Sequence, residues 1–417
     1  MKTNAVRLYK ADTLSLDNFE LPEISPDEIL LKVITDSLCA STYKAVIQGS
    51  AHKRVPNDIE ENPVIVGHEM CGEIVEVGSN LTKDWTVGQQ VIIQPALKLE
   101  NGYDPGYSYQ YIGGAATYAV VPKVVMDAGC LIPYAGEGSY KGSLVEAIGC
   151  VLRGFKGLYH TNFTDYARTD GAKVGGHIAI LGGAGPMGLA AAALAVNYAK
   201  ASVVTVVDIN AERLAYVEKR FPPSNFKDCK LSYVNTSGCE NPTEMLKELS
   251  GGGYDDVFVM VPVPALFTLA EEICRDDGCV NFFAGPSKHD FPGSLNLYRV
   301  HYNGIHVVGT AGSIPEDTID TVKLIEENAI DPSIMVSHIL GLNAYADAIF
   351  DMKNPSGLKK VCYTHIDLPM VAIEDFAELG KTDPLFAELD KIVKANGGLW
   401  CKEAEDYLLA NAPELKV

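Results

Sequence analysis

The sequence predicts an α/β protein with two parts: a barrel-like β domain and a doubly wound parallel sheet. Three observations lead to this fold class. The 417 residues exceed the roughly 100–200 residues of one ordinary domain. Residues 1 to about 150 alternate polar and apolar positions between turn signals, as half-buried strands do. From about residue 177, short apolar strands alternate with helical patterns, which is typical of a parallel sheet covered by helices.

In the first part, strands are expected at residues 28–34, at 64–77 around a glycine, and at 85–93 after a turn. These belong to a first domain over residues 1–155. Residues 310–366 contain a helical pattern at 319–328 and a strand near 360–364, which is more than the parallel sheet needs. We therefore expect residues 310–366 to return to the first domain and complete it.

The second domain is expected over residues 156–309. Residues 178–196 are uncharged over the length of a membrane span, but the glycines at 182–188 divide them into a buried strand and an Ala-rich helix. Residues 367–417 carry helical patterns near 371–379 and 384–396 and should form an ordered helical extension. The expected strands of the sheet are 177–181, 202–208, 231–234, 256–261, 279–283 and 306–309, with helices such as 211–220, 243–249 and 265–274.

The composition indicates a globular protein with an acidic surface. Hydrophobic residues make up 47% of the chain and charged residues 21%, so extended disorder is not expected. The 34 basic and 54 acidic residues leave a net charge of −20, which repels nucleic-acid phosphates and anionic lipid headgroups. We expect a small-molecule substrate, and neither nucleic acid nor a membrane as a partner.

The cysteines and the N-terminus indicate a cytoplasmic protein. No two of the ten cysteines form a close CxxC pair, and the chain is far larger than disulfide-stapled scaffolds. Residues 1–10 lack the apolar core of a secretory signal. Free thiols in a reducing compartment are therefore expected.

A glycine-rich string after the strand at 177–181 indicates a dinucleotide site. Its glycines allow a tight turn, a close approach of the backbone to a pyrophosphate, and close packing of the next helix. Asp208, 20 residues past Gly188, is placed to bond the adenosine ribose and favours NAD over NADP. The alternative is a structural turn followed by a solvated aspartate. The candidate cofactor-binding residues are Gly183, Gly185, Pro186, Met187, Gly188, Asp208, Arg213 in the next helix, and Ala284 and Gly309 after later strands.

Residues of the β domain indicate a catalytic zinc site. Cys39 follows a strand, and His68 and Glu69 follow 29 and 30 residues later. A catalytic zinc ion takes three protein ligands from Cys, His and carboxylate and keeps a fourth position open. We expect Cys39, His68 and Glu146 as ligands, with Cys150 and Glu69 as rivals for the third position. Each residue also has a structural alternative, since buried histidines and cysteines are common in cores.

These motifs together resemble the zinc-dependent medium-chain dehydrogenase/reductase family over residues 1 to about 366. They stand in that family's order: Cys39-Ala40-Ser41, Gly67-His68-Glu69 with its sequel at 72–78, Val87-Gly88 with Val91, and the glycine-rich string with Asp208. The resemblance implies a GroES-like barrel, a Rossmann domain, a substrate site in the cleft between them, and a dimer or tetramer.

The sequence departs from the family pattern in three places. The family often has Asp shortly after the zinc cysteine, where this chain has Ser41-Thr42-Tyr43, so the orientation of His68 must be set another way. Residues 94–115 contain no cysteine, which predicts one catalytic zinc and no structural zinc. Ala147 follows Glu146 where the family has proline.

The resemblance also reaches the substrate. A glutamate as third ligand is similar to the sorbitol dehydrogenase branch, and residues 37–44 and 52–56 resemble bacterial L-sorbose-1-phosphate reductases. By this resemblance Ser41 begins a proton relay, unless it only caps a turn. Glu69 would orient the metal ion or exchange with water on it.

A short basic run suggests that the substrate carries a phosphate. Lys44, His52, Lys53 and Arg54 are candidate phosphate ligands on an acidic chain, although such a run is often only a solvated face. We expect a zinc- and NAD-dependent enzyme that interconverts a ketose phosphate and a hexitol phosphate, namely L-sorbose 1-phosphate and D-glucitol 6-phosphate. The alternatives are a dehydrogenase of an uncharged polyol or amino alcohol, and a nucleotide-binding protein without catalytic activity.

Overall fold

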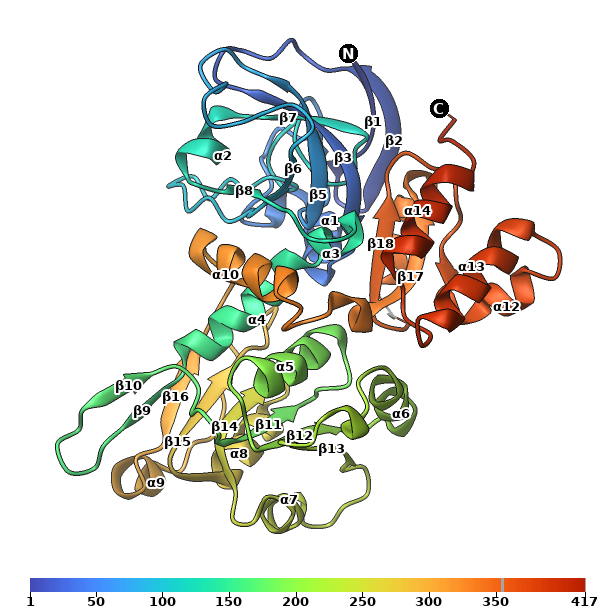
Figure 1. Ribbon diagram of the computed structural model, residues 1–417. Helices are drawn as coiled ribbons and strands as arrows, with labels where there is room; N and C mark the ends of the chain where they lie inside the picture. The colour runs from blue at the N-terminus through green and yellow to red at the C-terminus, as the bar shows by residue number, and fades with distance from the viewer. Residues whose placement is uncertain (354–355, 417) are drawn as a thin grey trace. The chain divides into compact units, whose positions relative to one another are not determined.

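The computed structural model describes residues 1–353 and 356–416. Residues 354–355, in the predicted segment 310–366, and residue 417, the last of the predicted extension 367–417, lie outside the described residues. The chain divides into two compact units (Figure 1). The first unit comprises Met1–Glu146, Ile314–Glu327 and Asp331–Val417. The second unit comprises Ala147–Ser313 and Asn328–Ile330.

The first unit is built on an eight-stranded sheet in the order β19-β17-β18-β3-β5-β6-β8, with β7 also paired to β3. A three-stranded sheet, β2-β1-β4, accompanies it. The central strand β3 (Ile29–Ser37) is almost wholly buried. Its Leu31 and Val33 share one apolar core with Ile74 of β5 (Met70–Val77) and Val91 of β6 (Gln90–Ile93). Burying this apolar face holds the unit together.

Segments far along the chain complete the first unit. Strand β18 (Lys359–Tyr363), expected near 360–364, pairs antiparallel with β3. The other strands are β1 (Lys2–Lys10), β2 (Thr13–Glu20), β4 (Val64–Ile65), β7 (Tyr118–Val121), β8 (Leu131–Pro133), β17 (Val336–Gly341) and β19 (Val371–Ala372), and the helices before the extension are α1 (Ala40–Gln48), α2 (Lys123–Asp127), α3 (Ser139–Ser143), α10 (Pro315–Glu326) and α11 (Tyr345–Asp351).

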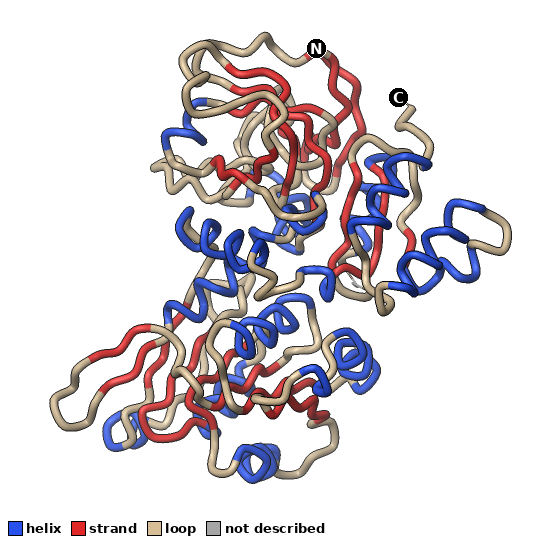
Figure 2. The backbone as a smooth tube through the Cα atoms, viewed as in Figure 1, coloured by secondary structure: helices blue, strands red, loops and turns tan. Residues whose placement is uncertain are grey.

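The second unit confirms the predicted doubly wound parallel sheet. Its six strands are all parallel, in the order β13-β12-β11-β14-β15-β16. Helices lie on both sides of this layer of strands (Figure 2). The strands are β11 (His177–Leu181), β12 (Val203–Asp208), β13 (Lys230–Asn235), β14 (Tyr254–Val259), β15 (Cys274–Phe282) and β16 (His306–Gly309), and the helices are α4 (Val145–Gly157, whose first two residues belong to the first unit), α5 (Pro186–Asn197), α6 (Ala211–Arg220), α7 (Pro242–Ser250), α8 (Pro264–Ile273) and α9 (Leu297–Tyr302).

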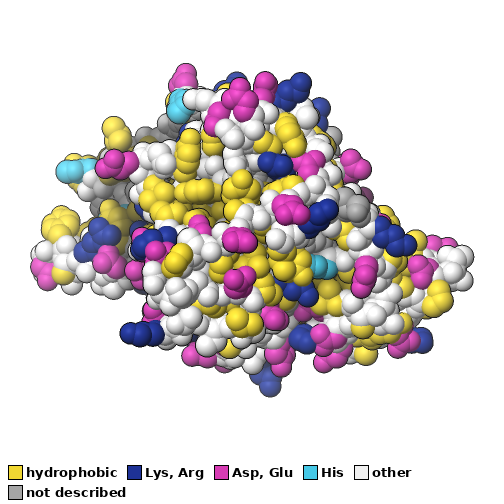
Figure 3. All heavy atoms as spheres, turned by 90° about the horizontal axis from the view of Figure 1, so that it is seen from above, with side chains coloured by type: hydrophobic (Ala, Val, Ile, Leu, Met, Phe, Trp, Pro, Cys, Tyr) yellow, Lys and Arg dark blue, Asp and Glu magenta, His cyan; other side chains and the backbone are white. Residues whose placement is uncertain are grey.

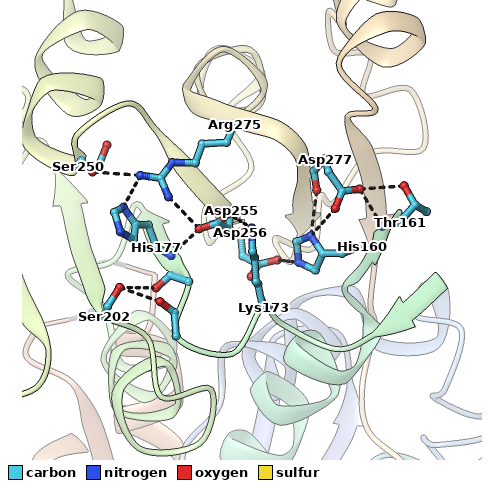
Figure 4. A network of polar contacts seen from close by, with 12 residues as sticks. His160, Thr161, Lys173, His177, Ser202, Ser250, Asp255, Asp256, Arg275 and Asp277 are labelled. Carbon is cyan, nitrogen blue, oxygen red and sulfur yellow. Dashed lines mark hydrogen bonds and ion pairs between the residues drawn. The ribbon is translucent and has the colours of Figure 1, made fainter. Parts of the chain in front are cut away.

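A hairpin that the sequence did not predict, β9 (Tyr159–Thr161) with β10 (Arg168–Asp170), is tied to this sheet by polar contacts (Figure 4). His160 Nε2 lies 3.1 Å from the buried Asp256 Oδ1, and His160 Nδ1 lies 2.9 Å from the Asp277 carbonyl oxygen. Burial opposes protonation of His160, but these acidic partners keep its pKa above the ordinary value. The network anchors the hairpin at the amino end of β14, away from the carboxyl ends that follow the glycine-rich loop.

The C-terminal extension differs in part from the prediction. Residues 371–379, expected to be helical, begin as β19, which pairs antiparallel with β17, and only α12 (Phe376–Leu379) is α-helical there. Backbone pairing with a neighbouring strand outweighs the local helical pattern. Two further helices follow, α13 (Pro384–Ala395) over the predicted 384–396 and α14 (Lys402–Asn411), which was not predicted. Between them the fully buried Trp400 donates a 2.8 Å hydrogen bond to Tyr363.

Acidic side chains are spread over the face drawn in Figure 3, with lysines and arginines among them, rather than gathered into one patch. No helix of the described residues is both long enough and apolar enough to cross a bilayer. The uncharged run at 178–196 is instead β11, a glycine-rich loop and α5, as predicted.

Candidate functional site

Two predicted metal ligands, Cys39 and His68, and one rival for the third position, Glu69, come together at the end of β3. Strands β3 and β5 pair antiparallel with Asp36 opposite Met70, so the turn after β3 and the turn before β5 lie side by side. Cys39 stands in the first turn, and His68 and Glu69 stand in the second. One ligand atom from each of these three residues lies within 4.8 Å of the others, and no second group of this kind occurs in the described part of the chain.

The turn before β5 depends on Gly67. Its φ is +89°, and a Cβ atom there would lie 2.5 Å from Asp36 Oδ2 and 2.8 Å from the Tyr345 hydroxyl. Asp36 accepts hydrogen bonds from the Glu69 backbone N–H at 3.0 Å and from the Tyr345 hydroxyl at 2.6 Å. Burial raises the pKa of Asp36 to about 8 despite these bonds. A side chain at position 67 would displace this anchor and move His68 with it.

Thr42 sets the orientation of His68. The Thr42 hydroxyl lies 3.0 Å from His68 Nδ1, where the family often has a carboxylate as the ring's partner. This contact leaves Nε2 directed toward Ser41, whose hydroxyl is 3.3 Å away, and toward the Cys39 thiol. A neutral hydroxyl therefore replaces the missing aspartate, one residue beyond the serine of the motif.

The donor set fits a zinc ion. Burial lowers the pKa of His68 well below its ordinary value, so the ring is neutral and keeps a nitrogen lone pair for a metal. Burial, with the charges of Glu69 and Glu146, raises the pKa of Cys39 to about 12. A thiol in such a place becomes a thiolate only beside a cation, which a bound zinc ion would provide.

Glu69 is committed to an ion pair. The Lys359 ammonium lies 2.6 Å from Glu69 Oε1, and the Ser37 hydroxyl donates to the other carboxylate oxygen. Both charged side chains are buried. Glu69 therefore has partners of its own beside the proposed metal ion, in keeping with an orienting role.

Glu146, the predicted third ligand, and Cys150, one of its two rivals, have different surroundings. Glu146, half-buried in the first turn of α4, contributes its charge to the raised pKa values of Cys39 and Lys359 and so lies near the group. Cys150, one turn later, places its sulfur 3.8 Å from the Ser313 hydroxyl in the second unit. The structure brings neither Glu146 nor Cys150 into the group of three, whose third member is Glu69, so Glu146 as a ligand stays a prediction.

Sequence reasoning missed Tyr107. Its hydroxyl lies 2.9 Å from Ser41 Oγ and 3.2 Å from His68 Nε2. The residue belongs to the cysteine-free segment 94–115, in which tyrosines stand at positions 103, 107, 109 and 111. That tyrosine-rich run is the signal that could have pointed to it.

The basic run lies next to the metal group through the same tyrosine. The His52 ring stacks on the Tyr107 ring at 5.9 Å with an interplanar angle of 10°, and the Arg54 guanidinium lies 5.0 Å from the Tyr107 ring centre. Burial, followed by the positive charges of Arg54, Lys53 and Lys44, lowers the pKa of His52 to about 4. Three charged side chains, Lys44, Lys53 and Arg54, thus create a positive field beside the metal group, and His52 stays neutral among them.

The predicted nucleotide residues lie at the carboxyl edge of the parallel sheet. The loop after β11 leads to Pro186 at the first position of α5. A Cβ atom at Gly188 would lie 2.2 Å from the Gly183 carbonyl oxygen, so close helix–strand packing requires glycine there. Asp208, at the end of β12, accepts a 3.1 Å hydrogen bond from the Ala184 N–H. The Arg213 guanidinium lies 4.0 Å from the Cβ position of Gly185, and Ala284 and Gly309 follow or end β15 and β16.

Comparison with known proteins identifies relatives along the whole chain. Residues 25–128 match the family described as alcohol dehydrogenase GroES-like domain, and residues 186–327 match the family described as zinc-binding dehydrogenase. Over 98% of this chain and 97% of each relative, identity is 46% to the uncharacterized protein YggP of Escherichia coli K12 and 43% to mannitol-1-phosphate 5-dehydrogenase of Aliivibrio fischeri. L-sorbose 1-phosphate reductase of Klebsiella pneumoniae is 41% identical over 99% of this chain and 98% of its own.

Solved structures share the fold. The crystal structure of 2R,3R-butanediol dehydrogenase from Bacillus subtilis matches with a TM-score of 0.72 at 20% identity, over 87% of this chain and 99% of that one. The extension at 367–417 is 51 of the 417 residues, so alignments over 98% of the chain include most of it. The full-length relatives named above therefore share the extension.

Proposed function

This chain belongs to the zinc-binding, GroES-like alcohol dehydrogenase family, and from that premise we propose that it is a zinc- and NAD(H)-dependent oxidoreductase of sugar phosphates. It would interconvert a ketose phosphate and a hexitol phosphate, with L-sorbose 1-phosphate and D-glucitol 6-phosphate as the first pair to test. The observation that carries the proposal is the placement of His52 and Arg54 on the ring of Tyr107, whose hydroxyl reaches Ser41 and His68.

Cys39, His68 and Glu146 would hold one catalytic zinc ion in the first unit. When bound, the zinc ion supplies Lewis-acid polarisation of the substrate oxygen and the nicotinamide supplies the hydride. Thr42, whose hydroxyl lies 3.0 Å from His68 Nδ1, would leave Nε2 free to bind the ion. With no cysteine between residues 94 and 115, we propose no second zinc.

Two hydroxyl groups would handle the proton. When a ketone accepts a hydride at carbon, its oxygen must gain one proton to become an alcohol. Ser41 Oγ lies 3.1 Å from Cys39 Sγ and 2.9 Å from the Tyr107 hydroxyl. We assign Ser41 as the donor to the substrate oxygen and Tyr107 as the group that returns a proton to Ser41.

The basic residues would hold the phosphate. Asp104 orients Arg54, since Asp104 Oδ2 lies 2.7 Å from Arg54 Nε, while the Lys53 side chain is exposed. With Lys53 and Arg54, Lys44 on α1 is the third side chain here that is positively charged at neutral pH. Arginine and lysine together satisfy the several oxygens of a phosphate.

We expect the double variant Lys53→Ala/Arg54→Ala to raise KM for a sugar phosphate by about 10- to 100-fold, because hydrogen bonds to charged groups are worth about 1.5–3 kcal/mol. KM for the corresponding free ketose should change little. The measurement is NADH oxidation with L-sorbose 1-phosphate and with L-sorbose. Lys123→Ala, which removes an exposed lysine of α2, is the matched control. Equal effects on both substrates would show that the basic run does not bind phosphate.

The ion pair between Arg54 and Asp104 favours a second candidate, a dehydrogenase of an uncharged polyol or amino alcohol. In that enzyme Arg54 would only stabilise the fold through Asp104, and Lys53 would be solvated. Turnover with free ketoses that exceeds turnover with sugar phosphates would select this candidate. Zinc content near zero with no turnover of either class would select a nucleotide-binding protein without catalysis.

We further propose NAD rather than NADP as the cofactor, because a 2′-phosphate would meet the Asp208 carboxylate. Asp208→Ser should raise the ratio of kcat/KM for NADPH to kcat/KM for NADH by about 10-fold or more, since one charge repulsion is worth at least about 1.4 kcal/mol at close range. Arg213, near the loop, would then face the added phosphate. Asp208→Asn, which keeps the shape and removes the charge, separates charge from geometry. An unchanged ratio in both variants would contradict the assignment.

The resemblance to the family also leads us to propose a homo-oligomer, a dimer or tetramer. All ten cysteines are free thiols, which supports a reducing, cytoplasmic location.

A further inference from the structure

Glu405 of the C-terminal extension is a buried carboxylate that binds the backbone of another segment. It lies on α14 with 2% of its surface exposed. One carboxylate oxygen accepts the Ser139 N–H at 2.8 Å, and the other accepts the Tyr140 N–H at 2.9 Å. Both amides begin α3, so the extension holds the start of that helix by a two-point contact.

The segment that Glu405 holds leads directly to Glu146. Helix α3 ends at Ser143, three residues before Glu146. On its other side α3 is bonded to β3: the Thr35 hydroxyl donates to the Ser139 carbonyl at 2.8 Å, and the Ser37 hydroxyl lies 3.2 Å from the Ser143 carbonyl. Strand β3 in turn leads into Cys39. The segment 139–146 is therefore fixed between the strand that places Cys39 and the carboxylate of Glu405.

Neighbouring contacts leave Glu405 little freedom. The Tyr140 hydroxyl lies 2.8 Å from the Ser333 hydroxyl, and Trp400, just before α14, is fully buried against Tyr363. Burial raises the pKa of Glu405 to about 7, so placing a carboxyl group here has a cost. Two backbone hydrogen bonds offset that cost only while α3 stays in place.

We propose that Glu405 is a positioning residue of the metal site, through which the C-terminal extension holds residues 139–146 so that Glu146 can bind the ion together with Cys39 and His68. The inference rests on the proposed ligand set. It gives the extension a part in the chemistry of a site whose first ligand lies more than 300 residues earlier in the chain.

The test compares Glu405→Gln with Glu403→Gln, an exposed residue on the same turn of α14. Glutamine keeps one acceptor oxygen but turns an NH₂ group toward a backbone N–H. The readouts are the zinc dissociation constant, from competition with a chelator, and the visible spectrum of the cobalt(II)-loaded protein, which reports the ligands and geometry of the metal. Urea unfolding, followed by the signal of the first unit, checks that each variant is folded.

We expect Glu405→Gln to weaken zinc binding by about 10-fold, the lower end for groups that orient metal ligands, and to shift the cobalt bands, because the start of the segment that leads to Glu146 loses one of its two bonds to the extension. Glu403→Gln should leave both unchanged. Glu405→Asp, which keeps the charge but withdraws it by one methylene, should give a smaller change in the same direction, and it is the variant to use if the glutamine form does not fold.

Glu146→Gln distinguishes the two ways in which the idea can fail. If Glu146→Gln weakens metal binding while both Glu405 variants bind zinc and cobalt as the unaltered protein does, the positioning role is wrong and the proposed function stands. If Glu146→Gln itself leaves metal binding unchanged, the ligand set is wrong and this inference falls with it.

Discussion

Replacing Cys39 with alanine is expected to reduce bound zinc from about one ion per chain to near zero and to lower kcat/KM by roughly a thousandfold or more. Cys39 is the only thiol in the group of ligand atoms found within the described residues. Lewis-acid polarisation is worth several kcal/mol, and each 1.36 kcal/mol is a factor of ten in rate. The remaining ligands would be one neutral imidazole and carboxylates, a set that binds zinc more weakly.

Metal content of the purified protein and NADH oxidation measure this effect. Cys130→Ala is the control, because Cys130 is a free thiol of the first unit, like the half-buried Cys39, but is buried in the β-sheet core. The control should retain zinc even if it loses some stability through the small cavity it creates. A Cys39→Ala protein that keeps a full equivalent of zinc would show that the ion sits elsewhere, and the proposed chemistry would not hold.

Replacing Lys359 with methionine is expected to destabilise the first unit by about 3–5 kcal/mol, because it leaves the Glu69 charge buried without its partner. Lys359 also lies 3.3 Å from the Leu38 carbonyl oxygen. Burial alone would lower the pKa of Lys359, yet the carboxylates, Glu69 foremost and Glu146 with it, hold it above the ordinary value. The ammonium group is therefore charged at neutral pH, and its removal changes the balance of charge around the proposed metal ion.

Urea unfolding of metal-free protein measures this loss, with the signal of the first unit followed separately from NADH binding by the second. The double variant Lys359→Met/Glu69→Leu should recover most of the stability, since a buried ion pair replaced by apolar side chains of similar size is often neutral. A single variant that loses less than about 1 kcal/mol would mean that Glu69 finds another partner or accepts a proton at small cost.

The nucleotide half of the protein was predictable because its signals are local. Strand, glycine-rich loop, helix and the next strand with Asp208 occupy 32 consecutive residues, from His177 to Asp208. Apolar periodicity predicts the strands. The loop is predicted from its glycines, because close packing leaves no room for a side chain at Gly188. The missed β9–β10 hairpin has strands of only three residues each, of which β10 is exposed and polar, and it is held by bonds from the His160 side chain to distant aspartates.

For the metal site the sequence predicts types of ligand, and the ligand set itself stays a prediction. The sequence favoured Cys39, His68 and Glu146 over the rivals Cys150 and Glu69, but it could not say that Thr42 would be the partner of His68 in place of an aspartate. Nor could it place Tyr107 on Ser41. Hydrogen bonds between side chains produce no periodic pattern in the sequence, so one partner cannot be predicted from the other.

The sequence by itself determined the two-part fold and the chemistry of the ligands, because hydrophobic period, glycine sterics and donor type are properties of short stretches of chain. Only the tertiary structure decided which charges surround the proposed metal position. Lys359 is 290 residues from Glu69, and Glu405 is 266 residues from Ser139. Lys359 meets Glu69 because β18 pairs with β3. The extension packs against β18 through Trp400 and Tyr363, which brings Glu405 to Ser139. Contacts of that kind arise from burying whole elements together, which no local stretch of sequence encodes.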